Sequence, residues 1–360
     1  MLIINHNKFL EKYNLIFVEN VKNCTMNKKL GLLFILLFCV ISWKGLQSQD
    51  KLFVVTTTSI FEDMVKNVGA DKVLTSSIVP VGSDPHSYEP RPSDVRMVAS
   101  ADIIFVNGLN LEGWILELIR NSGTKAPVIT LTQGINALRS SLYENAFDPH
   151  AWMDASFGVI YIKNIVEALQ NADPEHASIY EKELERYVQV IEETDSYIFE
   201  RIASIPSEQR LLITSHDAFA YYGKRYGLEL SALMGISTEA EPQTSDMVRV
   251  ARQIKQRKIP AVFIESTINP KLLEQIAKDH QINIGGELYS DSLGPEGSGA
   301  DSYTGMLKYN TDVITMALSK GIISGTKFNT SSSSNKWMIY TAILIFMGLV
   351  FIYMFKNTLQ

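Results

Sequence analysis

The chain of 360 residues contains only two cysteines, Cys24 and Cys39, and both lie within its first 40 positions. The rest of the sequence therefore has no disulfide, no thiolate zinc site and no cysteine nucleophile. Histidine is also scarce, with six in the sequence. A metal site in the body of the protein must use His, Asp, Glu or backbone oxygen as ligands, so the position of each histidine is informative.

Positive charge is in short supply as well. From Asp50 onward there are 27 basic and 37 acidic residues, which gives a formal net charge of −10. This part of the chain has no long stripe of Lys and Arg, which proteins that bind nucleic acid normally carry, so we expect no nucleic acid partner. Hydrophobic residues make up 46% of the chain, which predicts a folded globular protein. The length suggests about two domains.

The beginning of the chain has the pattern of a secretory signal. Two lysines precede an almost purely apolar run from Leu30 to Ile41, as in a basic segment followed by a hydrophobic one. We predict a leader over residues 1–49, with Met26 as the favoured start. Phe38 precedes Cys39, where a lipidation motif would require a small residue, so the pattern does not favour attachment of a lipid.

The end of the chain has a second apolar run. Residues 337–355 are 19 positions without a charged side chain, and a polar, Ser-rich linker over 326–336 precedes them. At about 1.5 Å per residue this run just spans a hydrocarbon core of about 30 Å. A buried helix of a soluble protein would normally have a polar face. We therefore predict a transmembrane anchor over 337–355 that holds an exported body at the outer face of the plasma membrane.

Between these ends, short β-branched runs alternate with helical patterns. Apolar strands separated by helices are typical of parallel sheets covered on both faces. Asp173 and Pro174 begin an apolar pattern with helical spacing that ends at Pro206. We predict an α/β fold with two lobes, over 50–172 and 207–325, joined by one long rigid helix over 173–206. The predicted strands cover Leu52–Thr57, Val73–Val79, Ala101–Val106, Val128–Leu131, Leu211–Thr214, Ala261–Ile264 and Ile284–Leu288.

Four side chains at the ends of loops form a candidate metal site. The tripeptide Asp-Pro-His occurs twice, ending at His86 and His150, and each copy lies in a predicted loop of the first lobe. Proline fixes the backbone before each imidazole, and Asp84 and Asp148 can orient the rings through their second nitrogens.

The second lobe contributes two further candidates. His216 and Asp291 each follow a predicted strand, and ligands of open α/β sheets bind beyond the carboxyl ends of strands. Since two candidates come from each half of the chain, they can meet only in a cleft between the lobes.

At these residues the chain resembles the cluster 9 (A-I) solute-binding proteins of ABC transporters, which capture zinc or manganese. The resemblance covers about residues 50–320, which is essentially the whole body. Each motif is weak alone, but together and in this order they are specific. Besides the two Asp-Pro-His tripeptides, the matching segments are 215–219, 237–242, 263–266, 270–271, 290–291 and 303–310.

The resemblance implies two Rossmann-like lobes around one metal ion in the inter-lobe cleft. It implies a monomeric extracytoplasmic receptor, not an enzyme, that delivers its cargo to the permease of an ABC importer. Glu265 and Glu241 match family positions, and we expect them to pack or to hydrogen-bond around the ligands. The ligands implied by motif position are His86, His150, His216 and Asp291.

Features of the ligand set and of the resemblance point to different metals. Three imidazoles and one carboxylate suit Zn²⁺, whereas Mn²⁺ favours more oxygen ligands. In the family, the position of His216 is His in many zinc binders and Glu in manganese binders, which favours Zn²⁺. Zinc members often have a His-rich loop between the first two ligands, but residues 132–147 contain no histidine. This absence moves the expectation toward a binder of both Zn²⁺ and Mn²⁺, so Mn²⁺ stays the alternative cargo.

Two other functions use the same residues. A zinc-dependent hydrolase could activate water with Asp217, Glu239 or Glu265, but it would need one of the four ligands to leave the metal. No further polar constellation for a substrate is visible in the sequence. An adhesin is the third alternative, because some members of the family carry that label, but the sequence has no adhesive repeat.

Overall fold

The computed structural model describes residues 51–140 and 146–319. The predicted leader, the polar linker and the C-terminal anchor lie outside these residues. Within the described ranges, none of the helices combines the length and the apolar character that a bilayer-spanning segment needs.

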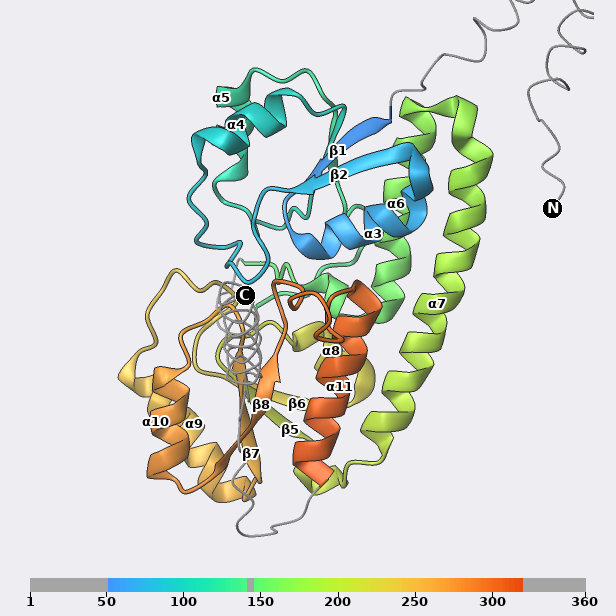
Figure 1. The fold of residues 1–360 in the computed structure, drawn as a ribbon. Helices are drawn as coiled ribbons and strands as arrows, with labels where there is room; N and C mark the ends of the chain where they lie inside the picture. The colour runs from blue at the N-terminus through green and yellow to red at the C-terminus, as the bar shows by residue number, and fades with distance from the viewer. Residues whose placement is uncertain (1–50, 141–145, 320–360) are drawn as a thin grey trace, which may run out of the picture.

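The first half contains a four-stranded parallel sheet with the order β2-β1-β3-β4 (Figure 1). Alternate residues of its strands face opposite sides, as the two-residue period of a strand requires. Val54 and Ile103 pack in one cluster with the helices α3 (Ser59–Gly69) and α6 (Ala155–Ala172). Val55 and Ile104 pack on the other side with the helices α4 (Pro92–Ala99) and α5 (Ile115–Ser122). The strands are β1 (Leu52–Thr56), β2 (Val73–Ser77), β3 (Ile103–Val106) and β4 (Val128–Thr130).

The second half contains two parallel strand pairs, β5-β6 and β7-β8. Strand β6 was not predicted, because four residues with an exposed first position give little hydrophobic signal. Gly285 and Gly286 look like interruptions of β8 in the sequence, yet both lie within it. A side chain at Gly285 would collide with Phe263, and one at Gly286 with Val313 of helix α11, so these glycines let α11 approach the strand closely. The elements are β5 (Leu211–Thr214), α8 (Ala220–Tyr226), β6 (Glu229–Ala232), α9 (Thr244–Arg257), β7 (Ala261–Glu265), α10 (Lys271–Asp279), β8 (Asn283–Leu288) and α11 (Tyr303–Ser319).

Helix α7 (Ala177–Ala203) runs along one side of both halves (Figure 1). Its 27 residues extend for about 40 Å. Pro174 lies in a short 3₁₀ turn before α7, so the α-helix begins four residues later than the predicted segment. The hydroxyl of Tyr187 donates to Asp63 of α3 at 3.4 Å, and Asp195 pairs with Arg225 of α8. The long helix is therefore fixed to both halves, while the lobe boundaries at 172 and 207 stay a prediction.

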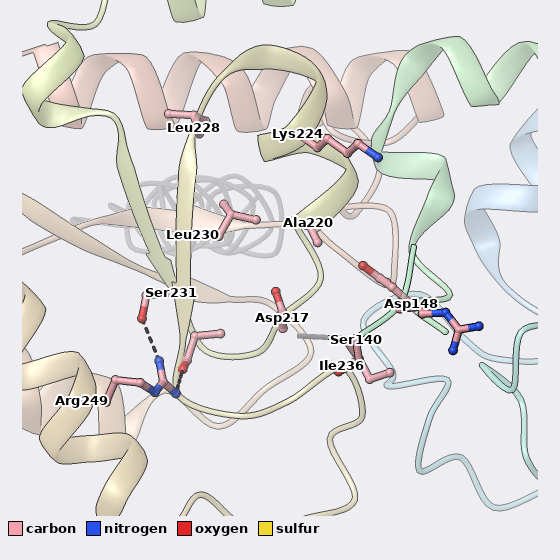
Figure 2. A pocket seen from close by; sticks show the side chains of 12 residues that line it. Ser140, Asp148, Asp217, Ala220, Lys224, Leu228, Leu230, Ser231, Ile236 and Arg249 are labelled. Carbon is pink, nitrogen blue, oxygen red and sulfur yellow. Dashed lines mark hydrogen bonds between the residues drawn. The ribbon is translucent and has the colours of Figure 1, made fainter. Parts of the chain in front are cut away.

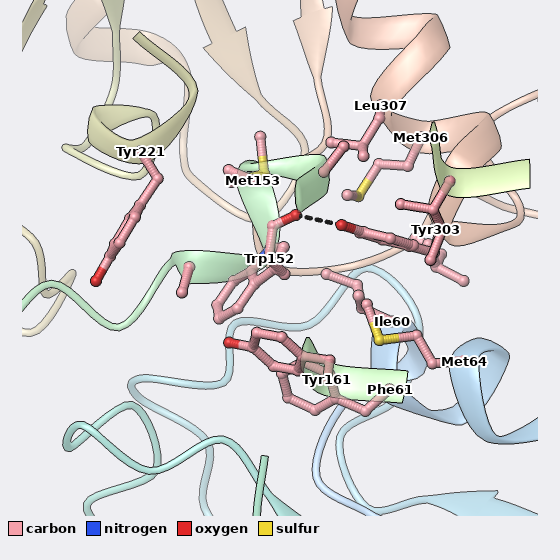
Figure 3. Close-up of a cluster of buried hydrophobic side chains, with 14 of the residues drawn as sticks. Ile60, Phe61, Met64, Trp152, Met153, Tyr161, Tyr221, Tyr303, Met306 and Leu307 are labelled. Carbon is pink, nitrogen blue, oxygen red and sulfur yellow. Dashed lines mark hydrogen bonds between the residues drawn. The ribbon is translucent and has the colours of Figure 1, made fainter. Parts of the chain in front are cut away.

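A hydrophobic cluster with side chains from both halves of the chain surrounds Trp152 (Figure 3). The ring of Trp152 meets Phe61 edge-on, with 5.6 Å between the ring centroids. Its indole nitrogen donates to the carbonyl of Ser290 at 2.8 Å. The hydroxyl of Tyr303 donates to the carbonyl of Trp152 at 2.7 Å, in space left open by Gly158. Since this core contains residues of both halves, it fixes the segments that carry His150 and Asp291 relative to each other.

Candidate metal centre

The structure brings the four predicted residues together at the junction of the two lobes. His86 lies in the loop after β2, and His150 directly precedes a 3₁₀ turn over Ala151–Met153. His216 follows β5, and Asp291 follows β8. All four side chains are buried, and one ligand atom from each lies within 4.8 Å of those of the others.

Several distances within this cluster are those expected between ligands of one metal ion. The Nε2 atom of His150 lies 3.2 Å from Nε2 of His86 and 3.3 Å from Nε2 of His216. The two carboxylate oxygens of Asp291 lie 3.3 Å from His150 Nε2 and 3.2 Å from His216 Nε2. A tetrahedral zinc ion with bonds of about 2.0 Å has ligand atoms about 3.3 Å apart. Four of the separations in the cluster match this value, and all four ligand atoms lie within 4.8 Å of one another, so the cluster has the size of a site for a single divalent metal ion.

Two further carboxylates hold the imidazoles of His150 and His216 from behind. Oδ1 of Asp148 lies 2.7 Å from Nδ1 of His150 and accepts the backbone amide of the same residue at 2.9 Å. Glu265 places Oε2 2.8 Å from Nδ1 of His216 and accepts its amide on Oε1 at 2.8 Å. A carboxylate on Nδ1 directs Nε2 towards the metal position and makes the ring a stronger ligand.

These carboxylates also shift the pKa values of the histidines that they contact. Burial lowers the pKa of His150, but Asp148 and Asp291 outweigh this effect and raise it to about 9. The pKa of His216 is raised well above its ordinary value, because Glu265 and Asp291 outweigh burial in the same way. Burial lowers the pKa of His86 to about 4. A cation that binds at this cluster therefore competes with protons at His150 and His216.

Two of the predicted supporting roles were wrong in detail. Asp84 accepts the backbone amide of His86 at 2.9 Å, so it fixes the loop and not the ring. The reason is that its side chain folds back in a local turn, in which the hydroxyl of Ser87 also donates to it at 2.9 Å. Glu241 is exposed and lines a cavity on the second lobe, away from the imidazoles. The expectation for Glu265 agrees with its contacts to His216.

The bases considered for a hydrolase are not placed to activate water at this cluster. Asp217 lines a cavity of about 310 Å³ together with Asp148, and none of the four candidate ligands lines it (Figure 2). Burial and the nearby charge of Asp148 raise the pKa of Asp217. Glu239 is exposed, and Glu265 is already engaged with His216.

Sequence reasoning did not find the contacts that join the lobes around the cluster. Trp152 lies two residues after His150, and its position in the second Asp-Pro-His segment was the only signal for its role. Ser292 directly follows Asp291, and its Oγ accepts the amide of Gly82 at 2.7 Å. Thr238 donates a hydrogen bond to Asp84. Serine and threonine are common in loops, so nothing in the pattern distinguished these two.

A buried cluster of three imidazoles and one carboxylate, set between two α/β lobes beside a long helix, defines a metal-binding receptor. Comparison with family models identifies the family of metal-binding receptors to which the chain belongs. The chain belongs to the family described as zinc-uptake complex component A, periplasmic, whose model matches residues 54–317.

Relatives and solved structures agree with this assignment. A manganese ABC transporter substrate-binding lipoprotein of Streptococcus anginosus is 36% identical over 308 residues, covering 81% of this chain and 100% of the relative. The manganese-binding lipoprotein of Halalkalibacterium halodurans is 35% identical over 271 residues, covering 75% and 90%. The periplasmic zinc-binding protein of Treponema pallidum matches with a TM-score of 0.72 and 35% identity, covering 75% of this chain and 100% of that structure.

The family confirms the predicted class of function. The chain is a substrate-binding component of an ABC importer for a divalent metal, and the metal is cargo. It is not an enzyme, so the hydrolase alternative is wrong. The predicted α/β fold with two lobes, parallel sheets and one long helix is confirmed as well.

Proposed function

We propose that His86, His150, His216 and Asp291 hold one Zn²⁺ ion and that the protein delivers it to the permease of its importer. The observation that carries this proposal is the convergence of four buried ligand atoms within 4.8 Å of one another, with four separations of 3.2 to 3.3 Å among the imidazole nitrogens and the carboxylate oxygens. Four protein ligands close a tetrahedral shell, which suits holding a cargo ion and leaves no open position for a reacting water.

Mn²⁺ is the second candidate, and a specific feature of the site favours it. Each oxygen of Asp291 faces a different imidazole, so the carboxylate can bind through both oxygens and give a five-coordinate shell with more oxygen. The streptococcal and Halalkalibacterium relatives described above carry manganese in their names. Against this, three imidazoles suit zinc better than manganese. We infer a preference for Zn²⁺ with measurable binding of Mn²⁺.

Metal loading of the purified chain tests this proposal. The protein is stripped with a chelator, dialysed against equimolar Zn²⁺ and Mn²⁺, and examined by elemental analysis. We expect one zinc per chain and less than about a tenth as much manganese, because zinc exceeds manganese in affinity for nitrogen ligands. Equal or greater manganese would refute the zinc preference, and the absence of stoichiometric metal would refute the site.

We further infer that the protein acts outside the cytoplasm as a monomer held at the membrane by residues 337–355. The relatives named above are called lipoproteins, whereas Phe38 before Cys39 does not favour lipid attachment in this chain. A tether at the other end would serve the same purpose, since it keeps the receptor close to the permease and raises its local concentration.

Deletion of residues 327–360 tests the anchor. We expect the truncated protein to bind metal normally but to leave the membrane fraction, and metal uptake at limiting zinc to fall. The full chain, expressed at the same level, is the control. Normal membrane retention together with normal uptake in the truncated strain would refute the anchor.

A further inference from the structure

The four candidate ligands are not held equally firmly. His150 and His216 are fully buried, and each has a carboxylate on its ring and on its amide. Asp291 is 1% exposed and lies beside the shared core. His86 is the most exposed of the four at 4%, and within residues 51–140 and 146–319 the carboxylate that hydrogen-bonds it is Asp84, which accepts its backbone amide.

The segment that carries His86 is a loop between β2 and α4, and it depends on contacts with both lobes. Its own lobe holds it through the indole nitrogen of Trp114, which donates to the carbonyl of Pro85 at 2.8 Å. The second lobe holds it at two points. The amide of Gly82 donates to Ser292 at 2.7 Å, and the hydroxyl of Thr238 donates to Asp84.

Of the two hydrogen bonds to the second lobe, the one between Thr238 and Asp84 is linked most directly to His86. Asp84 accepts the His86 amide on one carboxylate oxygen and the Thr238 hydroxyl on the other. A single side chain therefore connects the backbone of a first-lobe ligand to a loop of the second lobe. Because the acceptor is a carboxylate, this hydrogen bond is stronger than one between neutral groups.

The same contact is accessible from outside the ligand cluster. Asp84 of the first lobe and Thr238 of the second both line a cavity of about 310 Å³, whose wall also contains Glu241 and Lys271. Water in this cavity can compete for the threonine hydroxyl. Once this hydrogen bond is broken, the loop keeps the contact of Gly82 with Ser292 to the second lobe, but Asp84 no longer ties the backbone of His86 to that lobe. His86 is then the ligand best placed to move away from the metal.

We propose that Thr238 is a positioning residue that latches the His86 loop across the two lobes and thereby sets the rate at which the metal dissociates. This inference rests on the proposed function, since it assumes that His86 is a ligand. The latch differs from the support of His150 and His216, because it comes from the opposite lobe and does not touch an imidazole.

The test uses the purified full chain loaded with Zn²⁺ and compares the wild type with Thr238→Val, which removes the hydroxyl and keeps the shape. Zinc release is followed after mixing with an excess of a chromogenic chelator. We expect release from Thr238→Val to be about tenfold faster, the effect of losing one hydrogen bond to a charged group. Thr238→Ser keeps the hydroxyl and should restore the slow rate.

Ser237→Ala is the matched control, because the Oγ of Ser237 accepts only the amide of Glu239 within the same loop. It should release zinc at the wild-type rate. All variants should still bind one zinc per chain and unfold at the wild-type temperature, which separates a latch from a general loss of structure. Wild-type release from Thr238→Val, or equally fast release from Ser237→Ala, would overturn the latch. Failure of the wild type to bind zinc would instead refute the proposed function.

Discussion

An Asp291→Asn variant should bind Zn²⁺ more than about 100-fold more weakly than the wild type. The substitution keeps the size of the side chain and removes its charge, so the site loses its only anionic ligand. Changes to the groups behind a ligand typically cost 10- to 100-fold in affinity, and a change to a ligand itself should cost more. Competition with a chelator of known affinity at neutral pH measures the effect.

The Asp291→Asn variant also tests whether Asp291 binds the metal or only supports the fold. His150 and His216 have raised pKa values partly because of Asp291, so its loss should leave fewer protons for the metal to displace. Asp279→Asn, on the exposed end of α10, is the control and should bind zinc normally. A zinc affinity within about threefold of the wild type for Asp291→Asn would contradict the assignment.

The sequence indicated the candidate site residues most clearly where the residue type is scarce and has few structural roles. Histidine is scarce in this chain, so the repeated Asp-Pro-His tripeptide pointed to His86 and His150, and the structure places both in the cluster. The central strands of the first half, β1 and β3, were equally clear, since most of their residues are buried. Helical spacing likewise located α7 to within four residues at its start.

Features that depend on tertiary contact could not be predicted in this way. The glycines of β8 resembled a break in the strand, and only the close approach of α11 explains them. Asp84 and Asp148 occupy equivalent positions in two identical tripeptides, yet only Asp148 reaches an imidazole ring. The difference arises from the surrounding backbone, which a tripeptide does not specify.

After Asp291→Asn, we expect the largest losses of Zn²⁺ affinity from changes to the carboxylates that contact the imidazoles. Glu265→Gln and Asp148→Asn should each weaken Zn²⁺ binding by about 10- to 100-fold, the usual cost of removing the partner of a ligating histidine. Each amide still fills the space and can still bond the backbone, but it no longer stabilises positive charge on the ring. Glu239→Gln is the control, because Glu239 is exposed and away from the rings.

Proton release distinguishes this electrostatic role from simple packing. In the wild type, Asp148, Asp291 and Glu265 raise the pKa values of His150 and His216, so an entering metal competes with protons at these two rings. Removing the charge of Glu265 lowers the pKa of His216, and fewer protons should then be released per zinc bound. Calorimetry in two buffers of different ionisation enthalpy measures that number. Unchanged proton release with weakened affinity would mean that Glu265 only positions the ring, whereas a decrease in both shows that its charge tunes the ligand.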